Sequence, residues 1–139
     1  MATFRVEKRV RTDDGGDMVD LTAWVRDGVR SSMLNHGIAC VFAAHSTAAI
    51  VLIEDEPGLR EDLRSALQRL LPKGVEYAHN GAWGDGNGHS HIRATLLGQS
   101  VSFPFSKGEP ELGTWQQVVL VELDNRARDR HIVLQLVGD

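Results

Sequence analysis

Two buried strands and one amphipathic helix are predicted by residues 38–72, which read IACVFAAHSTAAIVLIEDEPGLREDLRSALQRLLP. The apolar runs 38–44 and 48–53 have the length of strands rather than of helices. Across 59–70, leucine and alanine recur at the spacing of a helix, and Pro57 after an acidic segment suits the first turn. The polar triplet 45–47 therefore lies between two strands or in a bulge.

The rest of the chain adds more strands than helices. Strands are predicted at 3–11, 18–21, 100–105, 114–123 and 130–137, the last two as an antiparallel pair. Helices are predicted over 22–34, with Thr22 as N-cap, and over 91–97, ended by Gly98. Residues 73–88 are rich in glycine and aperiodic, which predicts a long loop with a function of its own.

Strands and helices in this order do not alternate regularly. That pattern predicts an α+β fold with a mainly antiparallel β-sheet, arranged as a sandwich or half-barrel, and two main helices. The length of 139 residues suits one domain spanning residues 1–139.

Composition excludes several classes of protein. A net charge of −4 argues against a nucleic-acid partner. No apolar stretch approaches the roughly 18 residues of a membrane span, so we expect no membrane partner. The single cysteine, Cys40, lies in an apolar run and is expected to be a buried hydrophobe. These features predict a cytoplasmic protein.

Four of the six histidines fall in two stretches that predict one polar site. His45, His79 and His91 together would give a three-histidine site with an open position, which is the arrangement of catalytic zinc. His89 would share a face with His91 only on an extended chain, because on a helix the two diverge by about 200°. We therefore set His89 aside as exposed or supporting. The alternative is that the histidines are solvated loop residues.

Polar residues around these histidines suggest further roles. Asp85 is expected to orient a histidine or to act as a base, although Asp-Gly and Asn-Gly pairs also simply form turns. Asn87 is assigned to the substrate pocket. Ser46 and Thr47 are interpreted as hydrogen-bond partners of phosphate or substrate, since no Gly-x-Ser-x-Gly nucleophile motif is present.

Three residues outside the histidine segments complete the predicted pocket. Arg93 is a cation able to hold an anion, with an ordinary surface charge as the alternative. Thr114 and Gln116 would share one face of a strand and line the pocket, with Trp115 in the core. The arginines of 126–130 are expected to form a solvated hairpin tip.

Four segments together resemble the signature of the YjbQ family. They are His45-Ser46-Thr47-Ala48-Ala49, the run from His79-Asn80 to Gly84-Asp85-Gly86-Asn87-Gly88-His89-Ser90-His91, Leu96-Leu97-Gly98, and Gly113-Thr114-Trp115-Gln116. The resemblance spans almost the whole chain and implies a small single-domain α+β protein that forms homotrimers.

The resemblance also implies an activity, secondary thiamine-phosphate synthase. That reaction joins hydroxymethylpyrimidine diphosphate to a thiazole phosphate, so the partner is a small phosphorylated substrate. A divalent metal, zinc, is implied at His45, His79 and His91, with Asp85 close by, and His89 matches a variable position. Asp85 and His45 are then the expected catalytic residues.

The expected chemistry leaves alternatives open. Diphosphate departure is usually assisted by magnesium, whereas a histidine cluster prefers zinc or another transition metal. A metal-dependent hydrolase of a small phosphorylated or carbonyl compound is therefore a second hypothesis. A non-catalytic metal- or metabolite-binding protein is a third.

Overall fold

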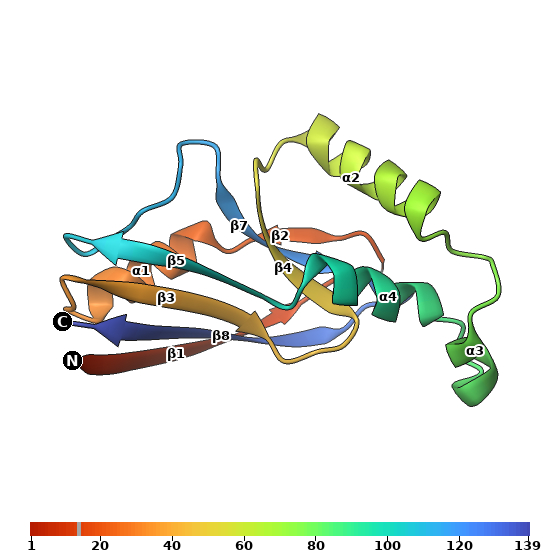
Figure 1. Ribbon diagram of the computed structural model, residues 1–139, viewed down its shortest axis with the longest axis horizontal. Helices are drawn as coiled ribbons and strands as arrows, with labels where there is room; N and C mark the ends of the chain where they lie inside the picture. The colour runs from red at the N-terminus through yellow and green to blue at the C-terminus, as the bar shows by residue number, and fades with distance from the viewer. Residues whose placement is uncertain (14) are drawn as a thin grey trace.

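The chain forms two antiparallel sheets and four helices in residues 1–13 and 15–139, which the computed structural model describes (Figure 1). The elements are β1 (Ala2–Arg11), β2 (Met18–Asp20), α1 (Thr22–Ser31), β3 (His36–Ala43), β4 (Ala48–Ile53), α2 (Pro57–Leu70), α3 (Ala78–Trp83), α4 (Gly88–Leu97), β5 (Ser100–Ser106), β6 (Glu109–Pro110), β7 (Gln117–Glu122) and β8 (Asp129–Gly138).

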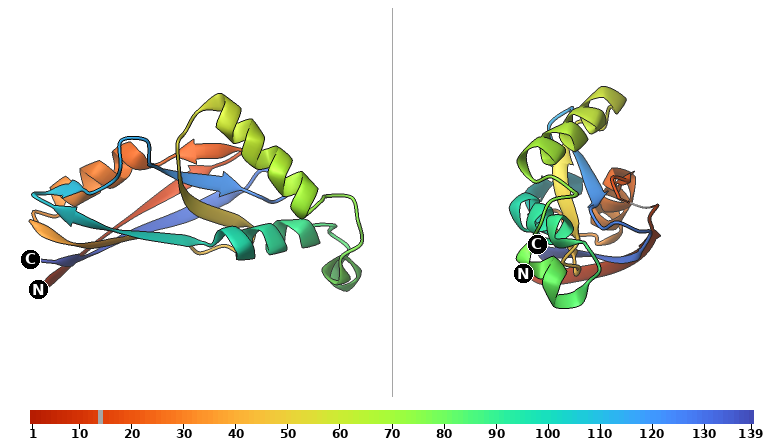
Figure 2. Two further views of the ribbon diagram at one scale, coloured as in Figure 1. Left: turned by 45° about the horizontal axis from the view of Figure 1, so that its top comes forward. Right: turned by 90° about the vertical axis from the view of Figure 1, so that its right-hand side faces the viewer.

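The larger sheet has the strand order β1-β8-β3-β5-β6, and the smaller has the order β2-β7-β4. Every pairing is antiparallel. The termini meet at one end of the larger sheet, where the Met1 ammonium lies 2.7 Å from the Asp139 carboxylate. The end-on view shows the curled, half-barrel arrangement of the strands (Figure 2). The predicted α+β fold is confirmed.

The smaller sheet is buried on both faces. Val118 and Leu120 of β7 pack toward the larger sheet and α1, whereas Val119 and Val121 pack toward α2 and α4. A strand covered on both faces needs no polar alternation, which explains the continuous apolar run of β7. The helices α2 and α4 both lie over the outer face of this sheet, and residues of both line a cavity against it (Figure 2).

Helix α2 begins as the sequence predicts. Pro57 is in the first turn, and the Glu56 carboxylate accepts hydrogen bonds from the backbone N–H groups of Gly58 and Leu59 at 2.8 and 2.7 Å. Helix α1 also forms, but Thr22 is not its N-cap. Its hydroxyl instead accepts the Val118 backbone N–H at 2.9 Å, which ties the helix start to β7.

The pairing of the last two strands was wrongly predicted. β7 pairs with β2 and β4, whereas β8 pairs with β1 and β3, so the two consecutive strands belong to different sheets. β7 also begins only at Gln117, after a turn that leaves Trp115 70% exposed rather than in the core. The 124–129 segment therefore crosses from one sheet to the other, with Arg126 exposed and Arg128 half-buried.

The predicted loop over 73–88 contains a short helix, α3, and α4 begins at Gly88 instead of His91. Close packing explains why the sequence shows no periodicity here. A Cβ on Gly88 would lie 2.5 Å from the Cβ of Tyr77, so only glycine lets the start of α4 approach the segment before α3. Cys40 is half-buried rather than fully buried.

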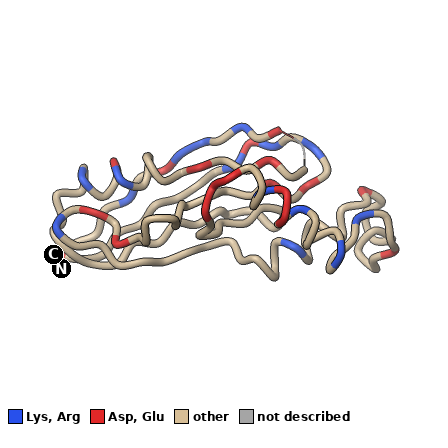
Figure 3. Tube along the Cα trace, turned by 90° about the horizontal axis from the view of Figure 1, so that it is seen from above, with Lys and Arg blue, Asp and Glu red and all other residues tan. Residues whose placement is uncertain are grey.

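Basic and acidic residues are interspersed along the chain (Figure 3). No helix of the described residues is long and apolar enough to cross a membrane.

Candidate functional site

Six of the predicted site residues meet at the end of the molecule where α3 and α4 adjoin the β3–β4 connection, and His79 lies next to them against His91. A cavity of about 290 Å³ is lined by His45, Ser46, Thr47, Asp85, Asn87, His91, Asp124, Arg128 and Arg130. Six of these nine residues were predicted from the sequence, and three come from the β7–β8 connection and the start of β8.

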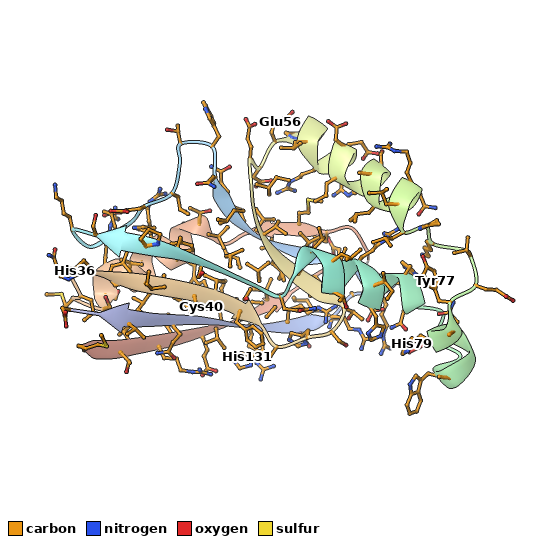
Figure 4. All side chains as sticks on the ribbon, viewed as in Figure 1. His36, Cys40, Glu56, Tyr77, His79 and His131 are labelled. Carbon is orange, nitrogen blue, oxygen red and sulfur yellow. The ribbon has the colours of Figure 1, made fainter. Side chains whose placement is uncertain are left out.

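His79 and His91 lie against each other although they belong to different helices. Their ring centroids are 4.3 Å apart with a tilt of 57°. The Nε2 atom of His79 is buried without a hydrogen-bond partner among the described residues, and Asp85 Oδ1 lies 4.0 Å from it. Gly84 closes α3 in the left-handed conformation, φ 71°, which turns the chain so that Asp85 comes back toward the ring. Figure 4 places His79 at this end.

His45 is held by a backbone group of the larger sheet. The His131 N–H donates to Nε2 of His45 at 2.8 Å, so that lone pair is occupied. The neutral ring then carries its proton on Nδ1, which is the nitrogen left for a ligand. Burial, followed by the charge of Arg130, lowers the pKa of His45 below its ordinary value. His45 is therefore a neutral hydrogen-bond donor at pH 7.

A buried ionic network forms the floor of the cavity. Glu122 is fully buried and Arg130 is 3% exposed. The Arg130 guanidinium donates to the Glu122 carboxylate and to the Thr47 hydroxyl, the latter at 2.9 Å. The Thr12 hydroxyl donates to Glu122 at 2.6 Å. The expectation that Arg130 lies in a solvated tip is wrong, because its charge is paired in the interior.

Asp124 joins this network to α4. Its carboxylate accepts hydrogen bonds from Thr47 Oγ1 at 3.1 Å, Arg128 Nε at 3.0 Å and Asn87 Nδ2 at 3.4 Å. Burial alone would raise the pKa of Asp124, but these donors and the Asn125 backbone N–H outweigh it and hold the pKa below its ordinary value. Asp124 is thus a buried carboxylate that stays ionised.

Sequence reasoning missed Glu122, Asp124, Arg128 and Arg130. One signal was available: Glu122 interrupts the apolar run 118–123, and an acid in a buried strand needs a buried cation. The network also settles the place of Thr47, whose hydroxyl both accepts from Arg130 and donates to Asp124. Thr47 therefore connects charges beneath the cavity, while Ser46 remains exposed beside it.

A glycine-rich segment, 84–88, leads directly into the N-terminus of α4. Asn87 is the residue before the helix, and its Oδ1 is buried without a described partner. Backbone N–H groups and the helix dipole make such a terminus favourable for anions. The Gly88 N–H already donates to Asn80 Oδ1 at 2.8 Å, and the N–H groups of Ser90 and His91 donate to the Asn87 carbonyl. The region therefore offers an anion the dipole of α4, and it offers one unpaired acceptor, Asn87 Oδ1.

The donor set fits a divalent metal only in part. Among the described residues, no three His, Cys, Asp or Glu side chains are arranged to share one ion. The unpartnered Nε2 of His79, the adjoining His91 ring and the Asp85 carboxylate are the nearest to a ligand set. His45 does not fit, because its Nε2 lone pair already accepts the His131 N–H.

The remaining predicted site residues do not line this cavity. Thr114 and Gln116 lie in the exposed turn before β7, where Gln116 Oε1 accepts the Gly113 N–H at 2.8 Å. Arg93 faces the other side of α4 and donates to Leu71 O at 2.9 Å. His89 also faces that side, and it is buried rather than exposed.

Comparisons with known proteins give one consistent family. The model of the family described as UPF0047 protein YjbQ-like matches residues 6–139. A UPF0047 protein of Methanothermobacter thermautotrophicus is 38% identical over 138 residues, covering 99% of this chain and 94% of that protein. One of Mycobacterium tuberculosis is 40% identical over 123 residues, covering 86% and 88%.

Solved structures agree with this result. A YbjQ-like protein of unknown function from Sulfolobus solfataricus superposes with a TM-score of 0.89 at 35% identity, covering 99% of this chain and all of that one. A hypothetical protein from Aeropyrum pernix gives a TM-score of 0.87 at 31% identity and full coverage of both. The chain belongs to the YjbQ (UPF0047) family.

Proposed function

We propose that the cavity binds a phosphorylated small molecule and that the protein catalyses a transfer reaction like that of secondary thiamine-phosphate synthase. The observation that carries this proposal is that His45, Ser46 and Arg128 line one cavity beside the N-terminus of α4. The dipole of a helix N-terminus, a guanidinium and a neutral imidazole donor are a set suited to phosphate oxygens.

The reaction defines what the site must stabilise. The bond between the pyrimidine methylene carbon and the diphosphate oxygen breaks, and a carbon–nitrogen bond forms to the thiazole ring. The diphosphate leaves with the electron pair, so negative charge grows on its oxygens. In this proposal His45 donates from Nδ1 to that leaving group, and Arg128 and the dipole of α4 stabilise its charge. Ser46 and Asn87 bind the rest of the substrate.

Asp85 acts through His79 in this proposal. Its carboxylate lies 4.0 Å from the buried Nε2 atom and orients the His79 ring. A divalent ion bound by His79, His91 and Asp85 would instead supply positive charge opposite the diphosphate. Nitrogen donors favour zinc for that role, and the diphosphate reaction favours magnesium.

A second candidate, hydrolysis of a small phosphorylated or carbonyl compound, is favoured by the same pair. A buried imidazole nitrogen beside a carboxylate is the arrangement of a general base that takes a proton from water. The hydrolase differs from the transferase in its product, because phosphate or acid appears without a second organic substrate.

The experiment is a product analysis with purified, metal-supplemented protein. Given hydroxymethylpyrimidine diphosphate and thiazole phosphate, the protein is expected to form thiamine phosphate and pyrophosphate in equal amounts. His45→Ala and His91→Ala should lower turnover, whereas His36→Ala should not, since His36 lies at the opposite end of the molecule (Figure 4). Phosphate release without coupling would favour the hydrolase, and saturable binding without product would favour the non-catalytic protein.

We further propose that the chain assembles as a homotrimer through the outer face of the larger sheet. Ile38, Phe42 and Val137 are 54%, 42% and 38% exposed there, and register places Ile38 opposite Val137. Apolar side chains on one sheet face support an interface. A location in the cytoplasm, like the homotrimer, remains a prediction.

A further inference from the structure

A second cavity, of about 380 Å³, lies between α2, α4 and β7. It shares only Asp124 with the lining of the candidate site. Helix α4 separates the two, because residues two apart on a helix diverge by about 200°. His91 accordingly lines the first cavity, and His89, 3% exposed, lines the second. His89 therefore marks a distinct pocket.

The second cavity carries two cations, Arg93 and Lys73, that form no ion pair with the described residues. Arg93 donates hydrogen bonds to Leu71 O at 2.9 Å and to the Gln68 amide oxygen at 3.1 Å. Arg64 donates to Gly16 O at 3.0 and 2.7 Å. These acceptors are uncharged, but Arg64 also forms an ion pair with the exposed Glu61, so the uncompensated guanidinium at the cavity wall is that of Arg93.

Carboxylates in the lining do little to offset this charge. Glu61 lies 3.7 Å from Arg64 and is exposed. The two others are already paired, Glu122 with Arg130 and Asp124 with Arg128. Lys73 adds a third cation to the lining. Among the described residues, Arg93 has no carboxylate within ion-pair distance, and burial lowers its pKa.

The floor of this cavity is apolar. Met18, Leu67, Val121 and Leu123 belong to the second core cluster, and each is buried. The His89 ring lies beside them, with its Nε2 3.3 Å from Ser90 Oγ. An apolar floor under a cationic wall matches a ligand with a flat apolar ring and one anionic group.

From this arrangement we infer that the second cavity binds a small aryl phosphate, with its ring on the apolar floor beside His89 and its phosphate on Arg64, Lys73 and Arg93. The inference is independent of the reaction proposed for the first cavity. A carboxylate in place of the phosphate would satisfy the same cations with less charge, so the two anions are compared directly in the test.

Calorimetric titration with phenyl phosphate tests this inference. Arg64→Gln and Arg93→Gln should each weaken binding at least about tenfold, the effect of losing a charge-assisted hydrogen bond. Arg69→Gln is the matched control, because it removes an exposed arginine of the same helix α2 that does not line the cavity. It should bind as the unaltered protein does.

Arg93 also ties α4 to the end of α2, so its removal could loosen the fold. Lys73→Gln avoids this problem, since the Lys73 side chain is exposed. It should weaken binding by about two- to fivefold, as expected for a solvent-exposed charge contact. Phenyl phosphate should bind more tightly than inorganic phosphate and than benzoate.

The inference is overturned if the unaltered protein shows no saturable binding, or if the Arg64, Lys73 and Arg93 variants bind as tightly as it does. His45→Ala separates the two cavities. If phenyl phosphate binding is lost in His45→Ala and kept in Arg93→Gln, the ligand occupies the first cavity and the inference fails while the proposed function stands.

Discussion

One hydrogen bond joins His45 of the β3–β4 connection to His131 of β8: the His131 backbone N–H donates to Nε2 of the His45 ring at 2.8 Å. The last paired residues of β3 and β8 are Ala43 and Ile132. The side chain of His45 therefore extends the ladder by one acceptor where the backbone of β3 has ended. This contact orients the ring and fixes which nitrogen faces a ligand.

This hydrogen bond predicts a pH dependence of stability. Burial and Arg130 lower the pKa of His45 in the folded protein, whereas the unfolded chain titrates near the ordinary value of about 6.5. Below that value the unfolded state binds more protons, so this contribution to the free energy of unfolding is lost as the pH falls toward the folded pKa. Urea unfolding at about pH 7.5 and about pH 5.5 measures it.

The control for this effect is His45→Gln, whose amide oxygen can accept the same N–H without titrating. The unaltered protein should lose more stability between the two pH values than the variant does. Equal losses in both would contradict the assignment of the titrating group to His45.

Metal binding should depend on two histidines and one carboxylate. Because Nε2 of His45 is occupied, we expect His79→Ala, His91→Ala and Asp85→Asn to weaken zinc binding by about tenfold or more, and His45→Ala to leave it unchanged. Equilibrium dialysis with elemental analysis gives the affinities. If His45→Ala also loses zinc binding, this expectation is wrong and the three-histidine site implied by the family resemblance is supported instead.

The buried pair Glu122–Arg130 predicts a large loss of stability from a single substitution. Arg130→Met would leave the Glu122 charge buried and unpaired, which should cost about 3–5 kcal/mol of unfolding free energy. Arg5→Met, which breaks an exposed pair with Glu7, should cost at most about 1 kcal/mol. Chemical denaturation compares the two, and similar losses would mean that the Arg130 charge is not essential to the floor of the cavity.

Assembly is tested at the outer face of the larger sheet. Phe42→Asp should convert a trimer to smaller species, because a charge would be buried at the interface. Leu70→Asp introduces the same change on α2, at a side chain that is 76% exposed, and should leave the mass unchanged. Light scattering after gel filtration reads the mass. A monomeric unaltered protein, or a trimeric Phe42→Asp variant, would rule out this interface.

Local patterns were sufficient to predict most elements. Alternation predicted β1, the apolar run 48–53 predicted β4, and Pro57 with the leucine spacing predicted α2. These signals are set by residues within one turn or one strand. Strand pairing is not decided by local patterns. β7 belongs to the smaller sheet, which is buried on both faces, whereas β8 belongs to the larger sheet, so the two strands do not pair.

The site was predicted in part for the same reason. The spacing of the histidines predicted a site at His45, His79 and His91, and the rings of His79 and His91 do lie against each other. The predicted helix began at His91 rather than at Gly88. Gly88 permits the close packing at the start of α4, but glycine is also typical of loops. That start decides which side of α4 each residue faces, and so it places Arg93 and His89 in a separate cavity.

The most direct test of the proposed site is an NMR titration of backbone amides with pyrophosphate. If the N-terminus of α4 holds the diphosphate, the amide signals of 85–88 and of Arg128 should shift most, saturably, and His45→Ala should weaken the binding. Unshifted signals in 85–88 at saturating pyrophosphate would contradict the account.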